Sequence, residues 1–435
     1  MSHSIRLGVG RNWKCWVSSL SLGLAVATLS LAPQASFSAD AEKGQTLSRV
    51  IAKEMTQAQK DLQAGKYQDA LTNLDAALTK SPLTAFDKFK IADFKGFAYV
   101  KLNKFKEAQE NYEQALASGL YTPQEAGEKE RTLFRLTASA QQYAKAIEFG
   151  KQASETAAFT TDDVGVMAQL YYLQKDCKDS AIWADKAMAA ERKAGEAPHE
   201  NLYQFKLQCA SDAGDTPTVI ANLVDLIRLT NKIQYWNSLL RIERQDERDD
   251  RNLLMIYRVM YNTNAMNAGS DYIEMAQLLG DAALPAEAAT VLDKANQAGL
   301  IKDEQKERTG RLSASFKTRA DADKKGLPQL DAESQKNPAG ELDVKLGEVY
   351  YGNGDFQNAV TAINRGLQKG KIKHLDEAYV YLGLSQARLN NMADAKKAFD
   401  QLKTVPDISP RVLKLWGLYS EKLGTPLVGA TTTQG

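Results

Sequence analysis

Residues 354–370 read GDFQNAVTAINRGLQKG, and the small residues in this stretch decide the predicted fold. A glycine stands two places before Phe356, and Ala359, Ile363 and Gly366 follow Phe356 at steps of 3, 4 and 3. Steps of three and four place side chains on one stripe of an α-helix. Alanine and glycine on that stripe predict that a second helix packs closely against it.

The same spacing recurs along the chain. Residues 65–82 read GKYQDALTNLDAALTKSP and residues 103–116 read NKFKEAQENYEQAL, each with a turn residue, a bulky residue and then a small residue in the same phase. The small residues of the first four blocks, Ala70, Ala108, Ala146 and Ser180, stand 38, 38 and 34 residues apart. A period in the thirties predicts an all-α stack of antiparallel helix pairs.

Small residues are predicted to be buried where paired helices cross, because a larger side chain would overpack the contact at a cost of ~1–3 kcal/mol. The predicted packing positions are Ala70, Gly96, Ala108, Ala146, Ala276, Ala288, Gly347, Ala359, Gly383 and Ala395.

These blocks resemble the tetratricopeptide repeat, in which small residues mark the crossing of two antiparallel helices and an aromatic residue braces the next pair. The resemblance covers most of residues 50–405 in about nine or ten units, several of them degenerate. It implies a right-handed superhelical solenoid that binds other proteins.

The pattern divides the chain into segments. The segment 303–340 is highly charged, contains Gly326 and Pro328, and is predicted to be a degenerate repeat or a hinge. Trp416 and Tyr419 lie on a predicted last helix that covers the open end of the stack. The predicted segments are 45–232 for N-terminal repeats, 233–302 for central repeats, 341–424 for C-terminal repeats with the capping helix, and 425–435 for a disordered tail.

The first forty residues have the composition of an export signal. Arg6, Arg11 and Lys14 precede an apolar stretch at 17–32, and small residues follow it. This order predicts a cleavable signal peptide over residues 1–39 and a periplasmic protein. An uncleaved membrane anchor is the alternative, but the stretch is shorter than the ~20 apolar residues of a membrane span and contains several serines.

Cys177 and Cys209 are the cysteines that remain after such processing. In an oxidising compartment they are able to pair, and the sequence leaves both the paired and the free state open. Their separation of 32 residues, with His199 nearby, fits no usual zinc spacing. No cofactor or metal site is predicted.

The sequence contains no recognisable catalytic motif, phosphate loop or basic stripe for nucleic acid. The formal net charge is +1, and the run RIERQDERDDR at 241–251 alternates in sign. A phosphate-binding surface would be predominantly basic. We interpret the run as ion pairs on an exposed helix and turn; in the alternative, Arg241 and Arg244 face a groove and hold an acidic partner.

In a helical solenoid the first helix of each pair lines the concave side. Residues of mixed aromatic, amide and charged character there suit a peptide or a helix of another protein. For the aromatic residues, packing between repeats is an equally good interpretation. Helical phase predicts the following groove residues: Phe97, Tyr172, Asn237, Arg241, Arg244, Gln277, Glu348 and Tyr351.

Two central stretches narrow the resemblance. Residues 235–261 read YWNSLLRIERQDERDDRNLLMIYRVMY and residues 269–301 read GSDYIEMAQLLGDAALPAEAATVLDKANQAGLI. Together they resemble exported tetratricopeptide proteins associated with TonB energy-transducing systems, although the proline-ended loop before the tryptophan is replaced here by LTNKIQYW. The resemblance implies a non-catalytic adaptor that binds TonB–ExbB–ExbD-type components and supports outer-membrane uptake.

Two alternatives remain open at this point. One is an adaptor for cell-envelope assembly or polysaccharide export. The other is an enzyme with an unfamiliar site in 303–337, where acidic residues accompany Arg311 and Arg319. The oligomeric state is also left open.

Overall fold

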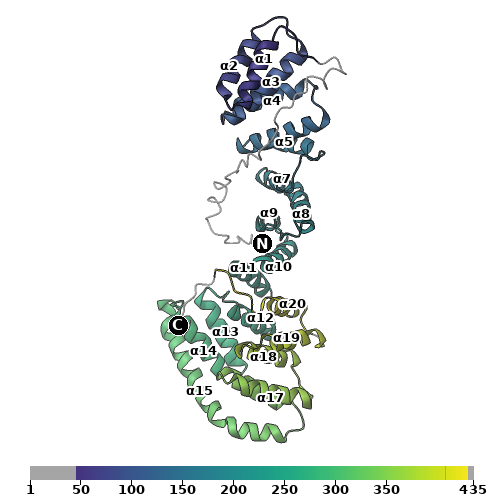
Figure 1. Cartoon of the computed structure of the whole chain (residues 1–435). Helices are drawn as coiled ribbons and strands as arrows, with labels where there is room; N and C mark the ends of the chain where they lie inside the picture. The colour runs from purple at the N-terminus through teal and green to yellow at the C-terminus, as the bar shows by residue number, and fades with distance from the viewer. Residues whose placement is uncertain (1–45, 407, 430–435) are drawn as a thin grey trace. The chain divides into compact units, whose positions relative to one another are not determined.

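The computed structural model describes residues 46–406 and 408–429, and the regular elements of this part of the chain are helices, with no β-strand (Figure 1). The predicted all-α class is therefore confirmed for the described residues. The predicted signal peptide at 1–39 lies outside them. None of the described helices is long and apolar enough to cross a membrane.

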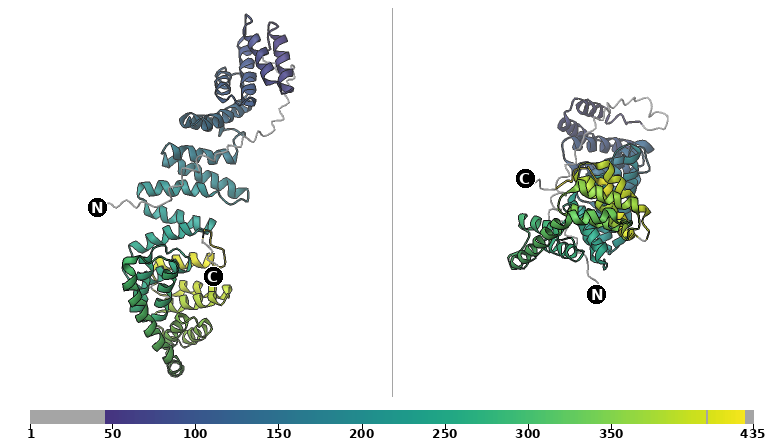
Figure 2. Two further views of the ribbon diagram at one scale, coloured as in Figure 1. Left: turned by 90° about the vertical axis from the view of Figure 1, so that its left-hand side faces the viewer. Right: turned by 90° about the horizontal axis from the view of Figure 1, so that it is seen from below.

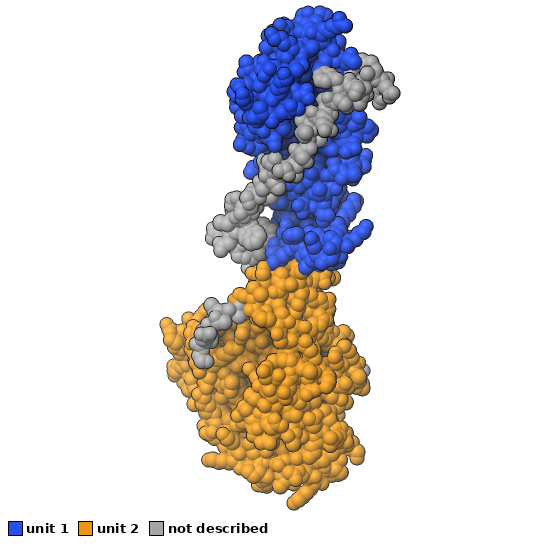
Figure 3. Space-filling view, viewed as in Figure 1, with its two compact units in different colours: residues 1–215 blue, residues 216–435 orange. Residues whose placement is uncertain are grey.

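The chain forms two compact units, unit 1 up to Asp215 and unit 2 from Thr216 (Figure 3). This boundary differs from the predicted divisions at 232 and 302, which followed changes in the repeat pattern. Each unit has its own helices and its own core.

Unit 1 consists of helix pairs joined by short turns, and Figure 2 shows its helices stacked in layers. Its helices are α1 (Ala52–Gln63), α2 (Tyr67–Leu78), α3 (Ala85–Lys101), α4 (Phe105–Ala117), α5 (Pro123–Ser139), α6 (Tyr143–Ala153), α7 (Thr161–Leu173), α8 (Cys177–Lys193) and α9 (Glu200–Ala213).

Unit 2 continues with helices of more varied length. They are α10 (Thr216–Thr230), α11 (Ile233–Gln245), α12 (Asp250–Asn262), α13 (Gly269–Asp281), α14 (Pro285–Gln297), α15 (Asp303–Lys336), α16 (Glu341–Gly352), α17 (Phe356–Lys369), α18 (Leu375–Arg388), α19 (Met392–Asp400), the short 3₁₀ helix η4 (Gln401–Thr404) and α20 (Pro410–Lys422).

The first helix of several pairs begins with the same capping device. The side chains of Thr84, Thr122 and Thr160 each accept a hydrogen bond from the backbone N–H three residues later. The acidic side chain at that later position accepts a hydrogen bond from the backbone N–H of the threonine. Such a capping box satisfies N–H groups that the helix itself leaves unpaired. These three threonines are 38 residues apart, the same period that the small residues show in the sequence.

The turn inside each pair needs a residue in the left-handed backbone region. Gly354, in the stretch quoted at the outset, has φ +78°, and Asn103 has φ +56° in the equivalent turn of unit 1. Glycine adopts this region without steric cost, and asparagine tolerates it better than most residues. The turn residue two places before the aromatic is thus a backbone requirement.

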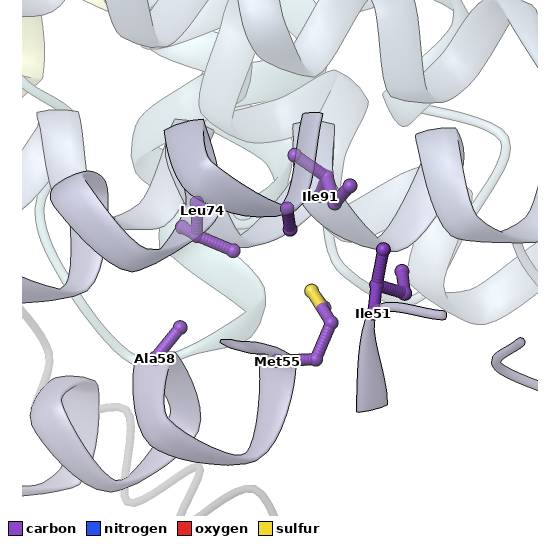
Figure 4. Packing of buried hydrophobic residues seen from close by; sticks show 6 residues of the cluster. Ile51, Met55, Ala58, Leu74 and Ile91 are labelled. Carbon is purple, nitrogen blue, oxygen red and sulfur yellow. The ribbon is translucent and has the colours of Figure 1, made fainter. Parts of the chain in front are cut away.

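The hydrophobic core follows the crossings of the paired helices. In Figure 4, Met55 and Ala58 of α1 face Leu74 of α2 and Ile91 of α3, and Ile51 closes one side. The structure buries every predicted packing residue: Ala70, Gly96, Ala108, Ala146, Ala276, Ala288, Gly347, Ala359, Gly383 and Ala395.

The glycines among these residues have no room for a side chain. A Cβ at Gly96 would lie 2.6 Å from the ring of Tyr112, and one at Gly383 would lie 2.5 Å from the ring of Phe399. At Gly347 it would meet the Ile363 side chain and approach the Ala359 carbonyl oxygen to 3.1 Å. In these pairs the backbone of one helix therefore packs directly against side chains of the other.

A disulfide bond joins Cys177 at the start of α8 to Cys209 near the end of α9. The structure thus pairs the two cysteines that the sequence left open. The bond ties the last helix pair of unit 1 to the helix that follows it.

The segment 303–340 was predicted to be a degenerate repeat or a hinge, and the hinge alternative is wrong. Helix α15 runs unbroken through Gly326 and Pro328. Tertiary contacts hold it on both sides of the proline: Phe316 is buried beside Gly280, and Leu327 packs with Leu346 of α16. Beyond the proline, Asp331 forms an ion pair of 2.7 Å with Arg365 of α17. Packing of this kind outweighs the lost backbone hydrogen bond.

The C-terminal end of the stack is also different from the prediction. Trp416 on α20 is buried and stacks on Phe399 at 5.2 Å, as a capping helix requires. Helix α20 does not cover an open end, however, because it packs on α10 and α12 as well as on α19. Unit 2 closes on itself.

The predicted disordered tail at 425–435 is wrong for residues 425–429, whereas residues 430–435 lie outside the described part. The Asn231 side-chain amide donates to the carbonyl oxygens of Thr425 and Pro426 at 3.1 Å. Val428 N–H donates to the Asn231 carbonyl, and Ile233 N–H donates to the Val428 carbonyl. These bonds give the polar backbone of the tail fixed partners.

We expect Gly347→Ala to destabilise the protein by up to about 2 kcal/mol, because overpacking costs ~1–3 kcal/mol and the gain in helix propensity offsets only ~1 kcal/mol of it. Gly310→Ala is the matched control: Gly310 is inside α15 and nothing lies within 4 Å of its added Cβ. The control should gain up to ~1 kcal/mol. Urea unfolding measures both, and changes of the same sign would contradict the close crossing at Gly347.

We expect reduction of the Cys177–Cys209 bond to lower the free energy of unfolding by about 3–4 kcal/mol, because the bond closes a loop of 32 residues. Thermal unfolding of the full chain with and without a thiol reductant measures this. A Cys177→Ser variant should unfold as the reduced protein does and should no longer respond to reductant. An unchanged unfolding temperature under reducing conditions would refute the expectation.

Candidate functional site

Helix α12 is the central helix of unit 2. Its residues 254–260 are consecutive and all buried, whereas a surface helix leaves one face in water. It packs on α11, α13 and α20, and Figure 1 shows it between α13 and the group α18–α20. Arg258 is the charged residue inside this buried run.

Arg258 connects three helices that are distant in sequence. Its guanidinium forms an ion pair of 3.3 Å with Glu287 of α14, donates to the Tyr381 hydroxyl of α18 and lies 4.4 Å from the centre of that ring. The Tyr381 hydroxyl in turn donates to Glu287 at 2.8 Å. A buried charge is tolerated when it is paired and hydrogen-bonded in this way.

A second set of charges surrounds the first. Arg251 at the start of α12 forms ion pairs of 2.7 Å with Asp376 and 2.8 Å with Glu377, both on α18. Lys345 of α16 reaches Glu348 at 2.9 Å and Glu377 at 3.6 Å. Glu377 therefore bridges α12 and α16, and each of the two cations already has two carboxylate partners.

The pKa values of the two carboxyl groups that Lys345 contacts shift in opposite directions. Burial raises the pKa of Glu348 to about 7, and Lys345 offsets only part of that effect. Burial also favours a higher pKa for Glu377, but the hydrogen bond from Arg251 and the charges of Lys345 and Arg258 lower the pKa below its usual value. Glu348 therefore gains a proton near neutral pH while Glu377 stays ionised.

A cavity of about 260 Å³ opens beside these charges, and we call it the inner cavity. It is lined from α12, α13, α16, α18 and the turn after α13. Its wall combines leucines with charged side chains. The lining residues are Asp250, Arg251, Leu254, Arg258, Leu278, Asp281, Ala282, Leu284, Lys345 and Glu377.

The predicted groove residues of unit 1 are half-buried and contact neighbouring aromatic residues. Phe97 meets Tyr67 edge-on at 6.3 Å, and the Lys101 ammonium lies 5.4 Å from its ring. Tyr172 stacks on Phe205 at 5.0 Å. These contacts match the interpretation of packing between repeats that the sequence left open.

The predicted groove residues of unit 2 near α11 and α13 are half-buried. Asn237 donates to the Ala265 carbonyl at 2.6 Å, and Arg244 forms an ion pair of 2.5 Å with Asp271. Arg241 and Gln277 have no side-chain hydrogen bond or ion pair with any described residue. None of the four lines the inner cavity.

Glu348 and Tyr351 are a correction to the groove prediction, because both are buried. Tyr381 of α18 packs on Tyr351 with ring centres 5.2 Å apart, so the inner face of α16 is covered. The prediction assumed an open solenoid, and unit 2 instead curls until its inner faces meet.

The charged run 241–251 forms ion pairs, but with partners distant in sequence. Glu243 and Glu247 lie 3.0 Å and 3.5 Å from Arg411 of α20. Arg251 binds α18, as described above. The run therefore connects α11 and α12 to the last helices of the chain, which the interpretation as a simple exposed helix did not foresee.

The possible enzyme site in 303–337 finds no support in the positions of its arginines. Arg311 is exposed and pairs with Glu307 one turn away on α15, and Arg319 donates to the Gly280 carbonyl. The two side chains do not converge on a pocket. Within the described ranges, no group of three His, Cys, Asp or Glu side chains is arranged to hold a metal ion.

Most residues of the inner cavity were not singled out from the sequence. Arg258 and Tyr381 are 123 residues apart, and Arg251 and Asp376 are 125 apart. Repeat periodicity does not report how far a stack curves. The signal present in the sequence was Arg258 itself, an arginine inside the otherwise apolar run LLMIYRVM.

Comparison with protein families matches residues 344–410, from α16 to the start of α20, to the tetratricopeptide repeat. Residues 344–410 are therefore similar to the tetratricopeptide repeat. The match includes the stretch 354–370 and its Gly354 turn. A search of curated proteins gives no match.

This chain is similar to several solved structures. YrrB, described as a tetratricopeptide protein with an unusual peptide-binding site, is 15% identical with a TM-score of 0.32, over 44% of this chain and 90% of that one. A tetratricopeptide protein from Parabacteroides merdae is 11% identical with a TM-score of 0.31, over 85% and 99%. The Naa15/Naa10 complex bound to HypK is 15% identical with a TM-score of 0.39, over 88% and 64%.

We expect stability to depend on pH through Glu348. Its pKa is raised in the folded state, so it contributes stability at low pH that is lost as the pH rises through about 7. Relative to Glu348→Gln, the free energy of unfolding of the native protein should fall by roughly 3 kcal/mol between about pH 5 and about pH 8.

Urea unfolding across this range measures the difference between the two proteins. Glu304→Gln, at an exposed position on α15, is the control and should show no such trend. A native protein that becomes less stable relative to Glu348→Gln as the pH falls would contradict the raised pKa of Glu348.

Proposed function

We propose that this chain is a periplasmic tetratricopeptide scaffold that binds components of a TonB–ExbB–ExbD-type energy-transducing system and supports uptake across the outer membrane. The scaffold would act by binding alone, with no reaction of its own. Its partner would be a segment of another protein, held at the inner cavity of unit 2.

One observation carries the proposal. The stretch 235–301, which resembles the TonB-associated proteins, forms helices α11 to α14. That stretch supplies eight of the ten residues that line the inner cavity, all except Lys345 and Glu377. The part of the chain with the most specific resemblance therefore also builds the hollow of unit 2.

Two further features support the periplasmic location. The composition of residues 1–39 is that of an export signal. The Cys177–Cys209 bond in unit 1 suits an oxidising compartment, since disulfides are rare in proteins of the reducing cytosol.

The proposal is tested in the cells in which the protein naturally occurs, which are made to produce the chain with a photo-crosslinking amino acid in place of Ala282. Ala282 is exposed and lies on the wall of the inner cavity. Ala314 on α15, also exposed but away from the lining, is the matched control. We expect Ala282, and not Ala314, to capture TonB, ExbB or ExbD-type proteins, identified by mass spectrometry.

The same cells test the location. The chain should be recovered from the periplasmic fraction without residues 1–39. Capture of polysaccharide-export or envelope-assembly proteins at Ala282 would replace the TonB assignment with the alternative adaptor function. A full-length chain retained in the cytoplasm, or no protein captured at Ala282, would overturn the proposal.

A further inference from the structure

The cations and the acidic residues that line the inner cavity differ in whether they have ion-pair partners. Its cations are paired: Arg251 with Asp376 and Glu377, Arg258 with Glu287, and Lys345 with Glu348 and Glu377. Each cation is therefore neutralised from within unit 2. A ligand carboxylate would have to displace a partner that is already in place.

Two acidic residues of the lining are in the opposite situation. Asp250 and Asp281 are exposed, and neither forms an ion pair or side-chain hydrogen bond with any described residue. Asp281 ends α13, whose last turn contains no basic residue. The carbonyl end of a helix carries partial negative charge, which adds to that of the carboxylate.

The remaining wall of the inner cavity is aliphatic. Leu254 and Leu284 are buried, and Leu278 is half-buried. An apolar wall beside free carboxylates fits a side chain that has a methylene stem and a charged tip. Lysine and arginine are the natural side chains with this composition.

The size of the cavity distinguishes a side chain from a whole ligand. Pockets for drug-sized molecules measure roughly 300–1,000 Å³, and the inner cavity, at about 260 Å³, is smaller. Asp250 and Asp281 of its lining are exposed to solvent, so a partner side chain is able to reach them while the rest of the partner chain stays outside.

We propose that the inner cavity recognises a lysine or arginine side chain of a partner protein, with its stem along the leucines and its cation at Asp250 and Asp281. The inference rests on the proposed scaffold function and names the chemistry of the partner segment. It concerns a site formed by unit 2 alone.

The test uses the full chain and three synthetic peptides, acetyl-(Gly-Xaa-Gly)₃-amide with Xaa as lysine, norleucine or glutamate. Norleucine keeps the methylene stem of lysine and removes the charge. We expect the lysine peptide to bind about tenfold more tightly than the norleucine peptide, measured by calorimetric titration, which corresponds to about 1.4 kcal/mol. The advantage should shrink at high salt, because the carboxylates are exposed.

The double variant Asp250→Asn/Asp281→Asn should lose that advantage and bind the two peptides alike. Glu304→Gln/Asp321→Asn changes the net charge equally at exposed positions on α15, and should bind as the native protein does. Unchanged thermal unfolding of both variants shows that the fold is kept. Equal loss in both variants would mean general charge attraction and would overturn the inference.

Preferential binding of the glutamate peptide, strengthened in Asp250→Asn/Asp281→Asn, would also overturn it, because Arg251 and Lys345 would then be the selective groups. The crosslinks at Ala282 separate this inference from the proposed function. A captured segment without lysine or arginine would refute the inference and leave the scaffold function intact. Failure to capture any protein would refute the scaffold function, whatever the peptides show.

Discussion

Unit 2 depends on the pairing of one buried charge. Arg258 is 2% exposed, and a guanidinium cannot shed its charge inside a protein. Removing a partner from such a buried ion pair costs several kcal/mol, so Glu287 and Tyr381 must stay in contact with it. That requirement brings α14 and α18 to α12. Arg258 is also part of the wall of the inner cavity, so the same contacts help to shape that cavity.

The same arrangement explains why the two units differ. In unit 1 each helix pair packs mainly on the next along the chain, through alanine and glycine crossings such as Gly96 against Tyr112. In unit 2 the crossings are of the same kind, as at Gly383 and Phe399, but ion pairs also join helices that are distant in sequence, as Arg251 of α12 does with Asp376 of α18. Apolar contacts hold the helices of each pair together, and ion pairs hold together helices of unit 2 that are distant in sequence.

The sequence predicted the interactions that repeat within about one period of the chain. Helix pairing, the turn at Gly354 and the buried Ala359 stripe all arise between residues that are close in sequence, so periodicity reports them. The continuity of α15 through Pro328 was not predictable in this way, because it depends on Phe316 and Leu327 meeting other helices. The burial of Glu348 and Tyr351 depends on α18, which periodicity cannot place.

The contacts of Asn231 have a consequence for how the chain acquires its structure. Its amide bonds to Thr425 and Pro426 span 194 and 195 residues, and Arg228 reaches Glu421 across 193. Contacts between distant residues slow folding, because the intervening chain must be ordered first. Unit 1, built from neighbouring pairs, is able to assemble while later residues are still emerging. Unit 2 must wait for its final residues, and until they arrive Arg258 has no complete set of partners.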